Sequence, residues 1–182
     1  MSKALFLDRD GVINVDHGYV YQTDNFDFVD GIFDLVRTAR ALDFLIIIIT
    51  NQSGIGRGYY SENDFWKITE WLKERFAAEN CFIDEIYYCP HHPEAQIPKY
   101  RKFCDHRKPE PGMLLTAKKK YRLDMSKSVV VGDNVTDIQA GHKAGVGSLF
   151  LFNNGVPDSI CKQIDFRHVN DLRAVAASLI SG

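Results

Sequence analysis

The chain has 182 residues and a formal net charge of −2, with 45% hydrophobic and 25% charged residues. This length corresponds to about one domain, and the composition is that of a globular protein rather than a disordered one. The balanced charge argues against a protein that depends on general attraction to nucleic acid or to a membrane. The longest apolar run, residues 44–49, is far shorter than the ~20 residues that span a bilayer. We expect a single cytoplasmic domain over residues 1–182, monomeric and without a signal peptide.

Short apolar runs alternate along the chain with segments of helical periodicity. The runs are residues 4–7, 44–49, 83–88, 128–131 and 147–152. Because they are apolar at consecutive positions, they predict strands that are buried on both faces, as in parallel sheets. Helices are predicted after Ser61, from Pro111, and from about Asn134 to Lys143. The alternation predicts an α/β three-layer sandwich with a mostly parallel, Rossmann-like sheet.

Polar residues follow three of these strands, and a basic pair precedes the Pro111 helix. In chain order they are Asp8, Arg9 and Asp10; Thr50, Asn51, Gln52 and Ser53; Arg107 and Lys108; and Asp133 and Asn134. Ligands of open α/β sheets bind at the carboxyl ends of the strands, so we expect these side chains to meet on one rim. Two segments without either periodicity, residues 14–30 and 90–109, are long enough to be functional loops.

These residue types suit phosphoryl transfer. A phosphate dianion repels a bare carboxylate, and Mg²⁺ held by carboxylates removes that repulsion. Asp8 is then placed to attack phosphorus as the nucleophile. Asp10, two residues on and therefore on the same face of an extended strand, can protonate the leaving alkoxide and later deprotonate water. Thr50 can donate a hydrogen bond to the phosphoryl oxygens, and Lys108 can offset their charge.

Asp8 and Asp10, Thr50, Lys108, and the segment Gly132-Asp133-x-x-x-Asp137 together resemble the four motifs of the haloacid dehalogenase (HAD) superfamily of phosphatases. The resemblance implies the HAD fold, with Mg²⁺ bound by Asp8, by the backbone carbonyl of Asp10 and by Asp133. Asn134 can add a backbone carbonyl to this metal shell, although the related enzymes commonly carry lysine there. No large insertion follows the first or third strand, so we expect no cap domain.

Longer stretches resemble the D-glycero-D-manno-heptose 1,7-bisphosphate phosphatase family. They are F-L-D-R-D-G-V-I-N, V-D-H-G-Y-V, T-N-Q-S-G-I-G-R-G, Y-Y-C-P-H-H-P and R-K-P-E-P-G-M-L-L, between residues 6 and 115. The resemblance implies removal of the 7-phosphate from a sugar bisphosphate in the synthesis of lipopolysaccharide or S-layer heptose. The implied substrate-binding residues are Asp8, Arg9, Asp10, Asp16, His17, Gly18, Tyr19, Thr50, Asn51, Gln52, Ser53, Arg107, Lys108 and Asn134. Substrate choice would come from three loops around residues 16–19, 53–59 and 89–106.

The third loop has the composition of a structural zinc site. Cys89 and His91, then Cys104 and His106, supply two thiols and two imidazoles in close pairs, as in tetrahedral Cys₂His₂ sites. The family pattern has cysteine at the last position, so His106 is a departure. His92 is an alternative to His91. The remaining thiols, those of Cys81 and Cys161, lack such neighbours and are expected to be buried.

Three alternatives stay open. Histidinol-phosphate phosphatase has a similar core and zinc loop, although the stretch from Asp16 to Tyr19 favours the heptose substrate. A zinc-ordered binding module without catalysis is the alternative from another class, and the intact acidic motifs speak against it. A sugar phosphatase of loose specificity is the third.

Overall fold

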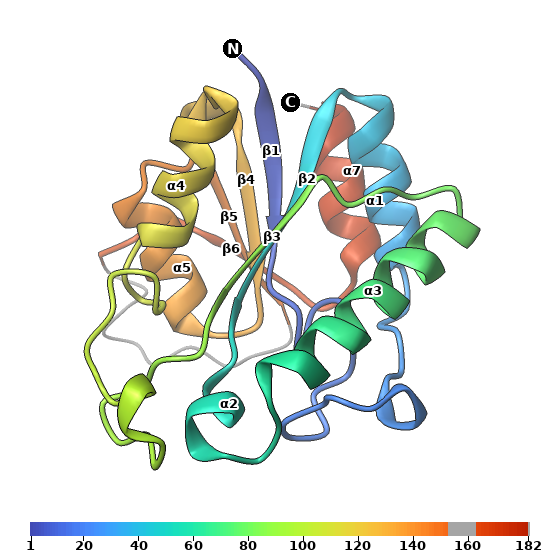
Figure 1. Cartoon of the computed structure of the whole chain (residues 1–182). Helices are drawn as coiled ribbons and strands as arrows, with labels where there is room; N and C mark the ends of the chain where they lie inside the picture. The colour runs from blue at the N-terminus through green and yellow to red at the C-terminus, as the bar shows by residue number, and fades with distance from the viewer. Residues whose placement is uncertain (153–162, 182) are drawn as a thin grey trace.

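The computed structural model describes residues 1–152 and 163–181. Its centre is one six-stranded sheet in the order β3-β2-β1-β4-β5-β6, in which every neighbouring pair is parallel (Figure 1). The strands are β1 Lys3–Leu7, β2 Phe44–Asn51, β3 Glu85–Cys89, β4 Val129–Gly132, β5 Ser148–Phe152 and β6 Arg167–Val169. The predicted parallel sheet is confirmed.

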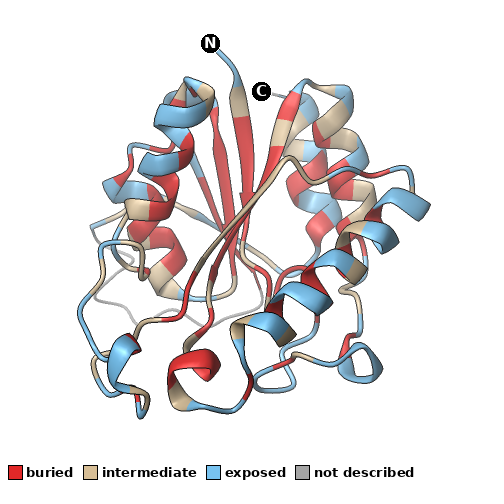
Figure 2. Cartoon of the chain, in the orientation of Figure 1, coloured by how far each residue is buried: buried red, intermediate tan, exposed pale blue. Residues whose placement is uncertain are grey.

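Helices cover both faces of the sheet. On one face lie α1 Ile32–Ala41, α3 Glu62–Ala78 and α7 Leu172–Ser181, and on the other lie α4 Gly112–Tyr121 and α5 Val135–Lys143 (Figure 1). Side chains alternate between the faces along each strand. Leu5 and Leu7 of β1 therefore pack with α1, α3 and α7, whereas Ala4 and Phe6 pack with α4 and α5. The central strands are buried on both faces (Figure 2), which explains their continuous apolar runs.

The position of the site follows from the strand order. β1 lies between β2 and β4, with Leu7 opposite Ile48 on one side and Val131 on the other. From β1 the chain proceeds outward to β2 and β3, and from β4 it proceeds outward in the opposite direction to β5 and β6. This reversal opens a crevice at the carboxyl ends of β1 and β4. Asp8, the first residue beyond β1, donates its backbone N–H to Val131 O at 3.1 Å and so begins at the floor of that crevice.

The structure contains elements that the periodicity did not predict. They are α1, β6, α7 and the short helix α2 Ser53–Arg57, which replaces part of an expected loop. Pro111 is the N-cap of α4 rather than part of its first turn, and Ser61 is the N-cap of α3 as predicted. Asn134, the approximate predicted start of the next helix, is the N-cap of α5. Three 3-10 turns, η1 Thr23–Asn25, η2 Pro98–Tyr100 and η3 Met125–Lys127, complete the set.

The part of the chain that the structure describes carries no cap domain over the sheet edge, as predicted. None of its helices is both long and apolar enough to cross a membrane. Cys81 is buried, and Cys161 lies outside the described residues.

Candidate active site

A cavity of about 510 Å³ opens at the carboxyl edge of the sheet. Predicted residues that line it are Asp8, Asp10, Asp16, Gly18, Tyr19, Asn51, Gln52, Ser53, Arg107, Lys108, Asp133 and Asn134. Tyr60, Thr136 and Asp137 line it as well and were not among the predicted site residues. The topology therefore brings together segments from four parts of the chain, as expected for the ends of parallel strands.

Lys108 lies at the centre of this cavity and is only 3% exposed. Its Nζ is 2.9 Å from Asp8 Oδ1, 2.5 Å from Asp137 Oδ1 and 3.0 Å from the carbonyl oxygen of Ile49. Burial by itself lowers the pKa of Lys108, but Asp137 and Asp8 outweigh burial and the pKa is raised. Lys108 is therefore a fixed positive charge beside the predicted nucleophile.

The backbone of Lys108 is held by Asn51, the last residue of β2. Asn51 Nδ2 donates to Lys108 O, and Lys108 N donates to Asn51 Oδ1, both at 3.1 Å. This reciprocal pair joins the loop before α4 to the sheet. Asn51 thus positions the lysine in addition to lining the cavity.

Three carboxylates form a cluster with this lysine. Oxygen atoms of Asp8, Asp133 and Asp137 all lie within 4.8 Å of one another. Burial raises the pKa of Asp133 to about 6, with a further contribution from Asp137. Burial likewise raises the pKa of Asp8 well above its ordinary value, although Lys108 opposes the shift. Acidic groups of like charge thus lie close together where burial raises their pKa values, and such clusters of shifted pKa values are typical of functional sites.

The cluster fits a divalent cation. Three carboxylates and one ammonium leave a net charge of −2 when all are ionised, and oxygen donors are the ligands that Mg²⁺ prefers. Asp8 and Asp133 were predicted ligands, whereas the Asp137 carboxylate was not. The sequence motif contained Asp137, but only the fold shows it beside Lys108. The Asp10 side chain is outside the cluster, and the role of its backbone carbonyl stays a prediction.

Asp10 is held by hydrogen bonds from three side chains. Arg9 Nη2 is 2.8 Å and 2.9 Å from the two carboxylate oxygens, and Asn14 and Gln52 each donate to one of them. The turn is tight because Gly11, at φ 88°, lies against Asp133, where a Cβ would come within 2.2 Å of the carboxylate. The D-x-D-G segment therefore needs glycine at this position.

Three predicted substrate-binding residues do not line the cavity. Arg9 is 2% exposed and its guanidinium is occupied by Asp10 and the carbonyl of Val20. His17 turns away, with Nε2 2.8 Å from Asp27 Oδ2. Thr50 is buried and its hydroxyl accepts from Gln52 at 2.8 Å. Sequence spacing places these residues next to segments that line the cavity but does not determine the direction of their side chains.

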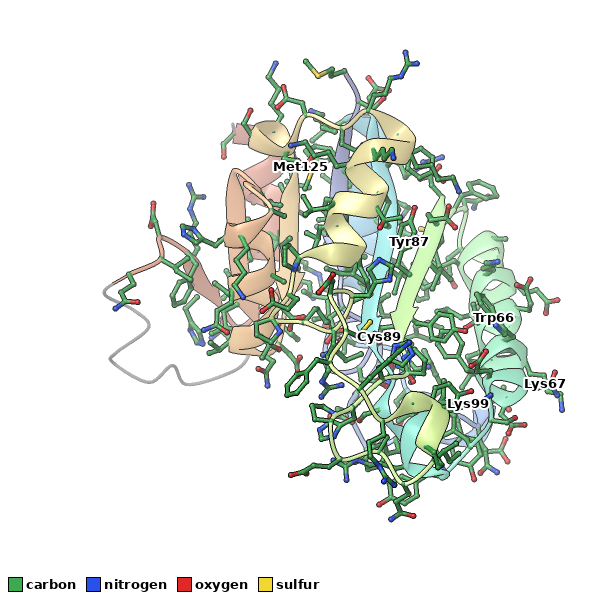
Figure 3. All side chains as sticks on the ribbon, turned by 60° about the vertical axis from the view of Figure 1, so that its left-hand side comes forward. Trp66, Lys67, Tyr87, Cys89, Lys99 and Met125 are labelled. Atoms are coloured by element: carbon green, nitrogen blue, oxygen red, sulfur yellow. The ribbon has the colours of Figure 1, made fainter. Side chains whose placement is uncertain are left out.

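The predicted zinc loop brings three of its four residues together. Cys89, at the end of β3 (Figure 3), His91 and Cys104 have their ligand atoms within 4.8 Å of one another. Burial raises the pKa of Cys89 to about 12, so this thiol needs a cation before it becomes a thiolate ligand. Two thiols and an imidazole fit zinc in the chemistry of their donor atoms.

The fourth predicted ligand, His106, is not part of this group in the described structure. Its ring packs on Gly112 at the start of α4, where a Cβ would lie 2.6 Å from His106 Cδ2, and its Nε2 is 3.2 Å from Thr116 Oγ1. His92 is also outside the group, because its Nδ1 accepts from the backbone of Glu94. Between the two alternatives, the geometry therefore favours His91 as the ligand.

Comparison with known proteins identifies the family to which this site belongs. A family model described as HAD-hydrolase-like matches residues 106–162. A D-glycero-alpha-D-manno-heptose-1,7-bisphosphate 7-phosphatase of Burkholderia mallei is 53% identical over 150 residues, covering 82% of this chain and 79% of that protein. A D-glycero-beta-D-manno-heptose-1,7-bisphosphate 7-phosphatase of Escherichia coli is 48% identical over 154 residues, covering 85% and 81%.

Solved structures give the same result. A HAD-like phosphatase from Mesorhizobium loti superposes with a TM-score of 0.88 at 32% identity, covering 99% of this chain and 87% of that one. The D,D-heptose 1,7-bisphosphate phosphatase from B. bronchiseptica, complexed with magnesium and phosphate, superposes with a TM-score of 0.84 at 30% identity, covering 98% of each chain. The chain therefore belongs to the D-glycero-D-manno-heptose 1,7-bisphosphate 7-phosphatase family of HAD hydrolases.

Proposed function

We propose that this chain is a Mg²⁺-dependent phosphatase that removes the 7-phosphate of D-glycero-D-manno-heptose 1,7-bisphosphate. The observation that carries the proposal is the ion pair between Asp8 and the buried Lys108, beside Asp133 and Asp137, in the lining of a cavity of about 510 Å³. Relatives at 53% and 48% identity bear the name of this activity. The buried carboxylate, the cation and the acid two residues on are the parts that phosphoryl transfer through an aspartyl phosphate requires.

The hydrogen bonds of Asp8 indicate which of its oxygens reacts. Among the described residues, Lys108 Nζ and the backbone N–H of Arg9 both donate to Oδ1, at 2.9 Å and 2.8 Å. Oδ2 is therefore the oxygen left for attack on phosphorus. The bond from phosphorus to the sugar oxygen breaks as the new bond to Asp8 forms, and the Asp10 carboxyl gives its proton to the departing alkoxide. Asp10 then takes a proton from the water that hydrolyses the aspartyl phosphate.

Asp8, Asp133 and Asp137, with the backbone carbonyls of Asp10 and Asn134, would hold Mg²⁺. When bound, the ion supplies positive charge that allows an anionic ester to approach an anionic nucleophile. Lys108 supplies a second, permanent positive charge at the same place. The metal set and the catalytic roles of Asp8, Asp10, Thr50 and Lys108 are part of this proposal. For Thr50 the role is indirect, through its hydrogen bond with Gln52.

Arg107 is placed to bind the second phosphate. It lines the cavity, and its Nη1 donates to the carbonyl of His91 at 3.1 Å, which ties it to the cysteine–histidine group. A planar guanidinium can bind phosphate through two hydrogen bonds. We propose that zinc held by Cys89, His91 and Cys104 orders this loop and so fixes Arg107. The zinc is structural in this proposal.

The experiment measures phosphate release by the purified chain with Mg²⁺ from the α and β anomers of heptose 1,7-bisphosphate and from histidinol phosphate. We expect kcat/KM for the preferred heptose anomer to exceed that for histidinol phosphate by about 10²-fold or more, the range in which a site built for polar groups discriminates. Phosphorus NMR of the product should show the 1-phosphate retained. Faster turnover of histidinol phosphate would reverse the assignment of substrate. We also propose that the protein is a cytoplasmic monomer and that its product supplies heptose for lipopolysaccharide.

A further inference from the structure

The catalytic acid Asp10 is restrained by two separate groups of donors. Arg9 contacts both carboxylate oxygens, with Nη2 at 2.8 Å and 2.9 Å and Nε at 3.2 Å from Oδ2, and Asn14 Nδ2 donates to Oδ1 at 3.1 Å. From the other side, Gln52 Nε2 donates to Oδ2 at 3.0 Å. The direction of the carboxylate in the cavity therefore depends on Gln52 as well as on Arg9.

The Gln52 amide has its own hydrogen bonds completed by two further residues. Its Nε2 also donates to Thr50 Oγ1 at 2.8 Å, and its Oε1 accepts from the hydroxyl of Tyr60 at 2.5 Å. Gln52 is 1% exposed, so water does not compete for these bonds. If the amide turned over, its oxygen would face Asp10, where it would either repel the carboxylate or accept the proton of the carboxyl that the leaving oxygen needs. The Tyr60 hydroxyl thus stabilises the orientation that keeps an N–H on Asp10.

Tyr60 is held firmly in place. Its ring stacks on Tyr21 with centroids 5.0 Å apart and planes at 12°, and it lies over Gly54 of α2, where a Cβ would come within 2.3 Å of the ring. It directly precedes Ser61, the N-cap of α3. Burial raises the pKa of Tyr60 above its ordinary value, so its hydroxyl keeps its proton and remains a donor at neutral pH.

We propose that Tyr60 is a positioning residue for proton transfer, acting through Gln52 to hold the Asp10 carboxyl toward the leaving oxygen. The inference rests on the proposed phosphatase function and deepens it. In the step concerned, a phosphorus–oxygen bond forms to Asp8 and the ester bond breaks. The proton of the Asp10 carboxyl moves to the departing alkoxide, and Asp10 becomes a carboxylate that accepts from Gln52. Gln52 thereby acts on the reaction through Asp10, in addition to lining the cavity.

The test compares esters whose leaving groups differ in their need for a proton. An alkoxide leaves only with protonation, whereas p-nitrophenolate leaves readily without it, and kcat/KM reports the steps up to the first irreversible one. Tyr60→Phe should lower kcat/KM about 10-fold for heptose bisphosphate and for glycerol phosphate. For p-nitrophenyl phosphate the loss should stay within about 2-fold. A general loss of folded enzyme would lower all three values equally and would overturn the proposal, as would no loss at all.

Two further variants isolate the path through Gln52. Tyr60→Phe added to Gln52→Ala should cost no more than Gln52→Ala alone, because the hydroxyl then has no amide to orient. Additive losses would overturn the proposed path. Tyr100→Phe is the matched control, since Tyr100 is a buried tyrosine whose hydroxyl donates at 2.5 Å to Glu62, outside the cavity lining. It should leave the ratio between the esters unchanged.

The glycerol phosphate arm separates this inference from the assignment of substrate. If the wild type hydrolyses glycerol phosphate but not heptose bisphosphate, the proposed substrate is wrong. The effect of Tyr60→Phe is then still decided by comparing glycerol phosphate with p-nitrophenyl phosphate. If the wild type with Mg²⁺ hydrolyses none of the three esters, the proposed function fails and the inference fails with it.

Discussion

The Nζ of Lys108 lies 2.9 Å from Oδ1 of Asp8, and the Lys108 side chain is 2% exposed whereas that of Asp8 is 13% exposed. The proposed nucleophile is therefore paired with a fixed cation before any substrate arrives. Because burial raises the pKa of Asp8 even with Lys108 beside it, the carboxylate depends on its positive neighbours for its charge. The same lysine also pairs with the buried Asp137, so one residue balances two acids.

Replacing this lysine tests that dependence. Lys108→Met should lower kcat about 10³-fold, since it removes a preorganised charge from the phosphoryl oxygens. In the metal-free protein it should also lower the free energy of unfolding by about 3 kcal/mol, because Asp8 and Asp137 are left without their cation. Kinetics and thermal melts in EDTA measure the two effects. Lys120→Met, which breaks the exposed pair with Glu85, is the control and should change neither value greatly. Equal melting temperatures for the two variants would contradict the expectation.

Asp8→Asn distinguishes an enzyme from a binding module. The amide keeps the size of the carboxylate but cannot form an acyl phosphate, so turnover should fall roughly 10⁴-fold or more. Mass spectrometry after rapid quenching should detect a phosphorylated wild-type chain and no phosphorylated variant. The melting temperature should be maintained. Burial raises the pKa of Asp8, which means that this position disfavours a charged side chain, so the neutral amide of asparagine costs no more to remove from water. A variant that releases phosphate as fast as the wild type would exclude Asp8 as the nucleophile.

Much of the fold could be predicted from the sequence because buried parallel strands are apolar at every position. The runs around residues 44–49 and 128–131 required no tertiary information, and Ser61 as a capping residue marked the start of one helix. Helix α1 was missed because its N-cap is Gly31 in a left-handed conformation, without a capping side chain. β6 has three residues at the edge of the sheet, too short for alternation to be recognised.

The sequence was sufficient to predict which segments form the site, but it was less informative about which side chains contact one another there. Asp8 and Asp133 converge because the carboxyl ends of parallel strands share one edge, and Lys108 joins them through the bonds of its backbone with Asn51 at the end of β2. The direction of His17 toward Asp27, and of His106 toward Thr116, depends on how the intervening loops fold, which the spacing of the motifs does not define. Tyr60 carried no signal at all in the sequence, because its role depends on the hydroxyl meeting the Gln52 amide.

Metal binding and pH should act together on stability through Asp133. Its pKa is about 6 in the metal-free fold against an ordinary value of 3.8. The proton is therefore bound more tightly in the folded state, and this contribution to stability is full below pH 3.8 and lost as pH rises through 6. In EDTA, raising the pH from 5 to 7.5 should lower the melting temperature by a few degrees, since ~1 kcal/mol corresponds to about 2–4 °C at this chain length.

Mg²⁺ should reverse that trend, because it competes with protons for the same oxygens. The rise in melting temperature on adding Mg²⁺ should be larger at pH 7.5 than at pH 5. Asp133→Asn is the control, because an amide neither titrates nor binds the ion well. Its melting temperature in EDTA should vary less over this interval than that of the wild type. A variant as sensitive to pH and Mg²⁺ as the wild type would show that Asp133 is not the group responsible.

Arg107 should determine affinity for the second phosphate. Burial lowers the pKa of Arg107, and the nearby positive charge of Arg57 lowers it further, so an anion between them relieves unfavourable electrostatics. Arg107→Met should raise KM for heptose 1,7-bisphosphate roughly 10–100-fold with kcat little changed, and leave KM for heptose 7-phosphate unaltered. Arg101→Met is a matched control on the same loop, since Arg101 bonds the carbonyls of Ala95 and Gln96 outside the cavity lining. A parallel rise in KM for both esters would assign Arg107 to the reacting phosphate instead.

Zinc content after dialysis tests the ligand set of the third loop. His91→Ala and Cys104→Ser should each lose the metal, because both supply atoms within 4.8 Å of the other ligands. His92→Ala should keep about one zinc per chain. His106→Ala should also keep it, since the His106 ring packs on α4 and not on the thiols. Loss of zinc in His106→Ala would mean that this ring leaves Thr116 to complete a tetrahedral site. Elemental analysis of the four variants, purified side by side, decides between a three-residue and a four-residue site.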